Sequence, residues 1–244
     1  LKQIKENNPD LIIGIGGCLM QREKAVSEIK EKYSHVDIVI GTHNIHKFKD
    51  IVRDIKNNKN RIIQVWEKEH GIIPETAVKR ENDYKAWVSI IHGCNNFCSY
   101  CIVPHVRGRE RSRNPDEIIS EVKRVVNDGI KEITLLGQNV NSYGSDLSIN
   151  YNFSDLLNEL EKIDNLARIR YMTSHPKDFS PDLIETIDLS EKVCEHFHLP
   201  VQSGSTEILK KMNRGYSRKE YIDLIKSIRR EIPDSSITTD IIVG

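Results

Sequence analysis

The sequence lacks a long apolar run and an excess of charge of either sign. None of its apolar segments approaches the ~20 residues that are needed to cross a bilayer, so we expect no membrane association and a cytoplasmic protein. Lysine and arginine together number 36, as do aspartate and glutamate, so the chain is not a bulk polycation. A nucleic-acid partner would therefore have to be bound by a local positive patch rather than by the net charge.

Cysteine is scarce, and its count is odd. The five cysteines among 244 residues are Cys18, Cys94, Cys98, Cys101 and Cys194. Disulfide scaffolds are shorter and denser in cysteine, and the sequence carries no secretory signal. Reduced thiols in a cytosolic compartment are therefore expected. Cys194 matches no motif, and we predict that it is a packing residue.

Three of these thiols stand in one segment, Cys94–Cys101, directly after the apolar run 86–91. A 4Fe–4S cube needs a ligand for each of its four irons, and thiolates are its usual protein ligands. A loop that supplies three thiolates leaves one iron open to a small molecule, as a catalytic zinc keeps an open coordination position. The alternative is a Cys₃His zinc site completed by His92, although structural zinc sites more often show two separated cysteine pairs.

Residues 1–59 show alternating strand and helix patterns. The expected strands are Leu11–Ile15 and Val36–Ile40, and the expected helices cover residues 26–33 and 45–55. This alternation is typical of a parallel α/β sheet. Because the chain begins inside the helix-like segment Leu1–Lys5, we expect residues 1–59 to be the carboxy-terminal part of a small α/β domain. Residues 60–85 predict a linker, with a strand at Arg61–Val65 before its charged stretch.

From residue 86 the alternation resumes with longer units. The expected strands are Trp87–Ile91, Glu132–Leu136, Ala167–Met172, Phe197–Val201 and Ile237–Val243. Helix starts are marked by Asn114-Pro115, by Ser180-Pro181 and by the capping-box pair Ser217 and Glu220. Five such units predict a partial TIM-like barrel over residues 86–244. Because nothing follows the last apolar strand to cover it, we expect the chain to be cut at both ends.

Polar residues follow each strand of the predicted barrel. They are the cysteine loop, Gly137 with Gln138, Ser174, Gln202 and Asp240. Barrels of this kind place their active sites at the carboxyl ends of the strands. We therefore expect these five positions to meet at one rim.

Several segments resemble the radical S-adenosylmethionine (SAM) methylthiotransferases. They are Gly17–Arg22, Gly93–Cys101, Arg107–Arg109, Leu135–Asn141, His198–Ser205, Met212–Tyr216 and Thr239–Gly244. Leu136–Tyr143 is similar to the branch that acts on tRNA, the MiaB type. The resemblance implies two 4Fe–4S clusters and SAM as cofactors, and methylthiolation at C2 of N6-isopentenyladenosine at about position 37 of tRNA, in the anticodon loop. It also implies an electron donor such as flavodoxin or ferredoxin, a truncated radical SAM core over residues 86–244, and an RNA-binding (TRAM-like) domain beyond it.

The resemblance also implies roles for individual residues. Cys94, Cys98 and Cys101 would hold the cluster that binds SAM and cleaves it to a 5′-deoxyadenosyl radical, which removes a hydrogen from the adenine ring. Cys18 would be one of three ligands of an auxiliary cluster that supplies or carries sulfur, with the other two upstream. The candidate SAM-binding residues are Tyr100, against the SAM adenine, and Gly137, Gln138, Ser174, Gln202 and Asp240.

The run Arg107–Arg113 holds four arginines beside the cysteine loop. We expect them to contact tRNA phosphates in part; the alternative is a solvated loop whose charges pair with Glu110 and Asp116. Two other functions remain open. One is a methylthiotransferase of the same family that acts on threonylcarbamoyladenosine in tRNA or on a ribosomal protein. The other is a non-catalytic Cys₃His zinc or electron-transfer module.

Overall fold

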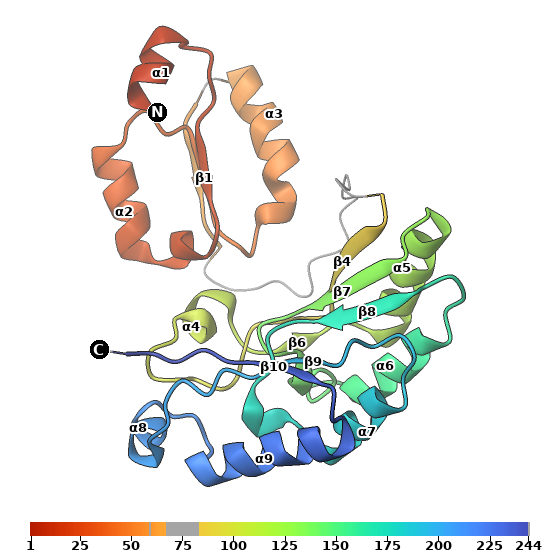
Figure 1. Ribbon diagram of the computed structural model, residues 1–244. Coiled ribbons are helices and arrows are strands. Elements are labelled where there is room, and N and C mark those ends of the chain that lie inside the picture. Colours follow the sequence, from red (N-terminus) through yellow and green to blue (C-terminus); the bar gives the residue numbers. More distant parts are fainter. Residues whose placement is uncertain (59, 67–82, 244) are drawn as a thin grey trace. The chain divides into compact units, whose positions relative to one another are not determined.

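The computed structural model describes residues 1–58, 60–66 and 83–243 (Figure 1). The chain divides into two compact units, Leu1–Val78 with His105–Gly108, and Lys79–Pro104 with Arg109–Gly244. Most of the predicted linker, residues 67–82, lies outside the described residues, as does Gly244. In the described part, no helix is both long enough and apolar enough to cross a membrane.

The first unit is built on a parallel sheet of three short strands. In the sheet order, these are β1 (Gly14–Gly16), β2 (Ile38–Ile40) and β3 (Ile62–Gln64). Its helices are α1 (Lys2–Asn7), η1 (Cys18–Gln21), α2 (Glu23–Lys32), η2 (Ile45–Lys47) and α3 (Phe48–Asn58). Because β3 pairs with β2, residues 62–64 belong to this sheet, whereas the sequence placed them at the start of the linker.

Apolar residues cover both faces of the central strand β2. Val39 packs with Ile29 of α2 on one face. Ile38 packs on the other face with Ile51 and Ile55 of α3. A parallel strand covered by helices on both faces is expected to be apolar throughout, and this confirms the α/β prediction for the segment.

The second unit contains the five predicted parallel strands. They are β4 (Lys85–Ser89), β7 (Glu132–Leu136), β8 (Arg168–Tyr171), β9 (His196–His198) and β10 (Ser236–Thr238). The sheet runs β4-β7-β8, a parallel bridge joins Ile169 to Val193 just before β9, and β9 pairs with β10. All carboxyl ends therefore lie at one edge, as in a partial barrel.

Three predicted strands of the second unit were too long, among them Phe197–Val201, since β9 ends at His198. Ile91 does not continue β4 but starts the two-residue strand β5 (Ile91–His92), which pairs antiparallel with β6 (Arg111–Ser112). The last strand ends at Thr238, and beyond it only an isolated bridge joins Ile241 to Gln202 among the described residues. Apolar runs predicted these strands, but the backbone turns away from the sheet to form the rim.

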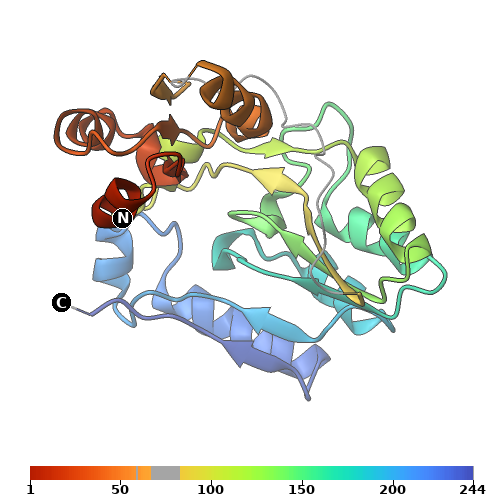
Figure 2. The same ribbon diagram turned by 90° about the horizontal axis from the view of Figure 1, so that it is seen from above.

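Helices cover one side of these strands (Figures 1 and 2). They are α5 (Pro115–Asn127), α6 (Phe153–Glu161), α7 (Pro181–Asp188) and α9 (Arg218–Glu231), with the shorter α4 (Val103–Arg107), α8 (Thr206–Lys211), η3 (Val140–Ser142) and η4 (Pro176–Asp178) at the rim. Asn114, Ser180 and Ser217 cap α5, α7 and α9 as predicted, and Ser217 forms the capping box with Glu220. The strand residues that face these helices are fully buried, so the main core lies between the strands and this helix layer.

Candidate functional site

The cysteine loop follows the first strand of the second unit. Cys94, Cys98 and Cys101 lie between β5 and α4, with Cys98 buried and the other two partly buried. Burial raises the pKa of Cys94, and the negative charge of Glu110 raises it further. The Cys94 thiol therefore keeps its proton at neutral pH, and a metal that binds its sulfur has to displace that proton.

A segment more than a hundred residues away holds this loop. We call this segment, Lys211–Arg214 at the end of α8, the clamp. The backbone N–H of Ser99 donates to the carbonyl of Met212 at 3.0 Å, and the Ser99 hydroxyl donates to the carbonyl of Lys211 at 2.7 Å. Both bonds fix the stretch of loop between the second and third thiols.

Asn213 of the clamp fixes the preceding turn. Its amide donates to the carbonyls of Asn96 at 3.3 Å and Phe97 at 3.0 Å. Phe97 has a φ of 48°, in the left-handed region that is uncommon for residues other than glycine. The guanidinium of Arg109 lies 4.7 Å from the centre of the Phe97 ring. The strained turn that presents Cys98 is therefore held from two sides.

Two further side chains fix the start of the loop. A carboxylate oxygen of Glu110 accepts from the Asn95 N–H at 3.1 Å, and the Asn95 side chain accepts from the Glu110 N–H at 3.3 Å. The side-chain oxygen of Gln138, at the end of β7, accepts from the Gly93 N–H at 2.7 Å. Gln138, a predicted SAM-binding residue, is thus a support of the cysteine loop in this structure.

A polar network joins the loop to the neighbouring strand ends. Asn96 accepts from the Lys177 ammonium at 2.6 Å and donates to Asp178 at 3.4 Å. The same carboxylate oxygen of Asp178 accepts from Asn139 at 2.7 Å. The loop after β4 is thereby connected to the residues that follow β7 and β8.

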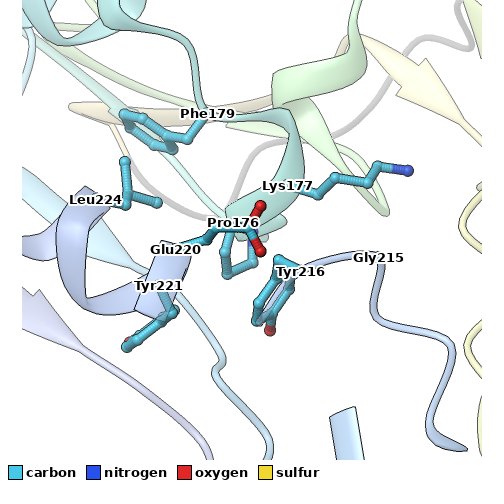
Figure 3. A pocket seen from close by; sticks show the side chains of 8 residues that line it. All are labelled: Pro176, Lys177, Phe179, Gly215, Tyr216, Glu220, Tyr221 and Leu224. Carbon is cyan, nitrogen blue, oxygen red and sulfur yellow. The ribbon is translucent and has the colours of Figure 1, made fainter. Parts of the chain in front are cut away.

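Behind this network lies a cavity of about 280 Å³ (Figure 3). Tyr216 and Tyr221, whose rings stack with centroids 6.2 Å apart, and Leu224 of α9 line it. Lys177 extends away from Tyr221 and Leu224 in Figure 3, in keeping with its bond to Asn96. The cavity separates η4 from the start of α9 and does not contain the thiols.

Gly137 is required by local packing. A Cβ at this position would lie 2.4 Å from Cγ2 of Ile91 in β5 and 3.3 Å from the Ile91 carbonyl. Only a residue without a side chain allows the end of β7 to approach β5 this closely. The predicted contact of Gly137 with SAM stays a prediction beside this packing role.

Two other rim predictions, Gln202 and Asp240, lie next to each other. The N–H of Gln202 donates to the carbonyl of Asp240 at 2.9 Å, and Gln202 adopts a left-handed φ of 67°. The Asp240 side chain is exposed and lies 3.4 Å from Nε2 of His198. The structure therefore brings together the ends of β9 and β10, as the barrel prediction requires.

Ser174 and His175 carry buried polar atoms at the end of β8. The hydroxyl of Ser174 and Nε2 of His175 are buried without a hydrogen-bond partner in the described part of the protein. Burial and, to a smaller extent, the positive charges of Arg214 and Lys177 lower the pKa of His175 to about 3. His175 is therefore neutral at physiological pH, and both atoms are available to a ligand.

Tyr100 lies between the second and third thiols. The residue is 44% exposed, and burial of its hydroxyl raises its pKa to about 12. The hydroxyl is 3.3 Å from a guanidinium nitrogen of Arg214, which donates to it. Tyr100 is thus held at its hydroxyl end while part of its ring is open to a ligand.

Cys18 lies in the first unit, just past the end of β1. Gly17, directly before it, has a φ of 123°, which starts the turn into η1. Gln21 at the end of η1 donates to the Trp66 carbonyl at 2.9 Å and accepts from the Thr42 N–H at 3.0 Å. These bonds anchor the turn that carries Cys18 to the segments that follow β2 and β3.

The arginine run does not form one cationic surface, which corrects part of the prediction. Arg113 is 6% exposed, and its guanidinium donates to Glu121 at 2.7 Å and to the Ser89 carbonyl at 2.7 Å. A buried, paired guanidinium cannot reach an RNA phosphate. Neither Glu110 nor Asp116 is its partner, so the alternative pairing is wrong for Arg113 as well.

Cys194 is partly buried and lines a second cavity of about 190 Å³ with Trp87 and Met172. Burial raises the pKa of its thiol. Cys194 is thus far from the cysteine loop in the sequence, and it lines a cavity whose lining residues do not include the loop thiols. Its role in packing stays a prediction.

Comparison with known proteins identifies the family. The model of the Radical SAM superfamily matches residues 88–244, which include the cysteine loop and all five barrel strands from Val88 onward. The chain belongs to the radical SAM superfamily. The chain is also similar to curated tRNA-2-methylthio-N(6)-dimethylallyladenosine synthases. It is 56% identical to the synthase of Thermoanaerobacter pseudethanolicus and 51% identical to that of Desulforamulus reducens, each over 244 residues. It covers 52% and 54% of those proteins, so the chain spans about half the length of the curated relatives it matches.

Solved structures of radical SAM enzymes share its fold. The cobalamin-dependent SAM radical enzyme OxsB in its apo form matches with a TM-score of 0.64 at 12% identity, over 98% of this chain and 37% of that one. With cobalamin and SAM bound, OxsB matches with a TM-score of 0.59. At such low identity the likeness concerns the fold alone, and it confirms the α/β radical SAM architecture.

The residues of this radical SAM chain fit the cofactors of its family, 4Fe–4S clusters and SAM. Three soft thiols in one loop match the ligands that such a cluster prefers. Among the described residues, no three Cys, His, Asp or Glu side chains converge as the ligands of a single metal ion do. A cube binds its thiolates at separate corners, so they need not converge on one point. The unpartnered Ser174 hydroxyl supplies a polar group for a bound ligand at the same edge.

Several residues of the candidate site were not predicted. They are Asn96, Glu110, Asp178, Asn213 and Arg214, which contact the loop or the network around it. The segment Met212–Tyr216 carried a signal, because it resembles a family motif. No function was predicted for this segment, since nothing in its spacing indicates contact with a loop more than a hundred residues away.

Proposed function

We propose that the chain is part of a radical SAM methylthiotransferase that adds a methylthio group to C2 of N6-isopentenyladenosine at about position 37 of tRNA. Cys94, Cys98 and Cys101 hold the cluster that binds SAM. Cys18 is one ligand of a second cluster, which takes part in sulfur insertion. The protein receives electrons from a donor such as flavodoxin or ferredoxin and works in the cytoplasm.

One observation carries this proposal. The chain is 51–56% identical, along all of its 244 residues, to enzymes whose name states this product. The identity extends through the first unit as well as the radical SAM core, so it includes the segment around Cys18. Our division into an amino-terminal α/β domain, a linker and a core at 86–244 is part of the same proposal, with β3 (Ile62–Gln64) counted in the first domain rather than in the linker predicted at 60–85.

The chain's own residues prepare and shield the reaction site. A 4Fe–4S cluster held by three thiolates supplies, when bound, an iron open to SAM and an electron for SAM cleavage. Glu110, Gln138 and the clamp hold the loop backbone, so the three sulfurs are positioned before a cluster is assembled. Tyr100, Gly137, Gln138, Ser174, Gln202 and Asp240 are the residues that we propose to line the SAM site.

The substrate is tested with tRNA from a strain that lacks the full-length gene. Digestion to nucleosides and mass spectrometry should show loss of the methylthio-isopentenyladenosine and accumulation of isopentenyladenosine. Complementation with the intact gene should restore the product, and complementation with a Cys94→Ala variant should not. Unchanged methylthio-isopentenyladenosine in the deletion strain would contradict the proposal. A missing methylthio group on threonylcarbamoyladenosine or on a ribosomal protein would point to the other branches of the family.

A second experiment separates the enzyme from a metal-binding module. The purified protein is reconstituted anaerobically with iron and sulfide and then incubated with SAM and dithionite. The proposal expects broad visible absorption and SAM-dependent release of 5′-deoxyadenosine. Stoichiometric zinc without either signal would favour a Cys₃His zinc module.

A further inference from the structure

Arg214 is a buried cation that contacts the cysteine loop directly. Its side chain is 5% exposed. One terminal nitrogen lies 3.4 Å from Sγ of Cys98 and 3.3 Å from the hydroxyl of Tyr100. Both residues belong to the same short stretch of the loop. The guanidinium therefore places a positive charge beside one of the proposed cluster ligands.

The rest of the Arg214 side chain is fixed by other contacts. Its second terminal nitrogen donates to the Pro200 carbonyl at 2.8 Å, and Nε donates to the hydroxyl of Tyr216 at 3.0 Å. The Tyr216 hydroxyl in turn lies 3.2 Å from the Pro200 carbonyl and 3.1 Å from that of Val201. Burial alone would lower the pKa of Arg214, but its contacts with Tyr216, Cys98 and Tyr100 together raise that pKa above its ordinary value. The guanidinium fork of Arg214 is thus held in one orientation, with its other terminal nitrogen turned toward the cysteine loop.

A hydrogen bond from a buried cation to a cluster sulfur has a defined physical effect. Reduction of a 4Fe–4S cluster adds one negative charge, and hydrogen bonds to its sulfurs are among the factors that set its potential. A nearby fixed positive charge stabilises the reduced form more than the oxidised form. Removing it should make reduction harder.

We infer that Arg214 is a positioning residue that orients Cys98 and Tyr100 and raises the reduction potential of the cluster in the cysteine loop. This inference rests on the proposed function, because it assumes that Cys98 is a cluster ligand. Arg214 acts through Cys98 and need not contact SAM or RNA. The clamp therefore acts on the loop in two ways. Its hydrogen bonds with Ser99 and those donated by Asn213 fix the loop backbone. The guanidinium of Arg214 sets the electrostatic environment of the Cys98 sulfur.

The test is an anaerobic redox titration followed by electron paramagnetic resonance. The protein carries the Cys18→Ala substitution throughout, so that the signal comes from the cysteine loop. Arg214→Gln should lower the equilibrium constant for one-electron reduction about tenfold, a shift of about 59 mV toward negative potential. Arg214→Lys, which keeps the charge, should fall between wild type and Arg214→Gln. Arg229→Gln, which removes an exposed arginine of α9, controls for net charge and should leave the potential unchanged.

The outcomes separate this inference from the proposed function. A wild-type protein that takes up no cluster would overturn the proposed function itself. A loaded Arg214→Gln variant with the wild-type potential would overturn only the role of Arg214. If Arg214→Gln does not fold, Arg214→Lys and Tyr216→Phe decide. Arg214→Lys replaces the guanidinium by an ammonium, and Tyr216→Phe removes the hydrogen-bond partner of Nε, so both alter the contact with Cys98 while a cation remains at position 214. A wild-type potential and resonance spectrum in both would then refute the inference, and a negative shift in either would support it.

Discussion

The two units place a cysteine at the same point of a parallel sheet but hold it in different ways. Cys18 follows the end of β1 in the first unit, and Cys94 follows β4 and β5 in the second. In the described part of the first unit, the turn that carries Cys18 is anchored by the Gln21 side chain and by the Gly17 N–H, which donates to the Ile40 carbonyl at 3.3 Å. The loop that carries Cys94 is held by the clamp, by Glu110 and by Gln138.

This difference follows from the number of ligands that each segment supplies. The cysteine loop provides three thiols, so one rigid loop can define the positions of three cluster corners. The segment around Cys18 provides one thiol, and a cluster bound there has to take its other ligands from elsewhere. Extensive hydrogen bonding is therefore useful in the second unit, where one segment sets the geometry of the site.

The largest expected effect comes from removing a loop ligand. Cys98→Ala should abolish SAM cleavage in the complete enzyme, by more than about 100-fold, because the cube loses one of three protein ligands. The fold should survive, since alanine fills part of the same buried space. Release of 5′-deoxyadenosine and far-ultraviolet circular dichroism measure the two quantities. Cys194→Ala serves as the matched control and should cleave SAM at the wild-type rate. A Cys98→Ala variant that does the same would contradict the ligand assignment.

Cys18→Ala should abolish methylthiolation but not SAM cleavage. In the complete enzyme SAM cleavage should persist, because the cysteine loop is intact, while the methylthio product should disappear. The two products are quantified in the same reaction, 5′-deoxyadenosine by chromatography and the modified nucleoside by mass spectrometry. Loss of both activities, with the protein folded, would show that the two units are not functionally separable.

Sequence patterns predicted the fold where local signals are strong. Asn114, Ser180 and Ser217 mark helix starts by chemistry that involves only the next three residues, and all three predictions are confirmed. The strand ends at Ser89 and Thr238 were missed because apolar character does not reveal where a backbone leaves a sheet.

The candidate site was predicted only in part, for the same physical reason. The three thiols were found because their spacing lies within eight residues. Arg214 and Asn213 were not assigned a role, since their contacts with the loop depend on how α8 packs. Arg113 was misjudged because a charged run in the sequence does not show which member is paired with Glu121 in the interior.

A smaller effect is expected from the pH dependence of stability in the second unit. His175 has an ordinary pKa of 6.5 and a folded-state pKa of about 3, lowered first by burial. Between these values the unfolded chain binds a proton that the folded chain does not, so stability is lost as pH falls through this window. The slope is up to about 1.4 kcal/mol per pH unit.

His175→Asn should flatten this dependence, because asparagine keeps an acceptor for the Lys177 N–H and does not titrate. Urea denaturation at pH 7, 6 and 5, followed by circular dichroism, gives the free energy of unfolding of each variant. Parallel pH curves for the variant and the wild type would refute the role assigned to His175.

The smallest effect is expected from a comparison of the hydrogen bonds that hold the two cysteine-bearing segments. Asn213→Ala removes two hydrogen bonds to the loop, worth about 1 kcal/mol each, and should speed the release of iron from the loop to a chelator. Gln21→Ala removes two of the bonds that anchor the Cys18 turn and should leave that rate unchanged. Stopped-flow absorption during chelation, in a Cys18→Ala background, measures the loop cluster alone. Equal acceleration by both variants would mean that global stability, rather than the clamp, controls cluster retention, and the contrast between the two units would then be wrong.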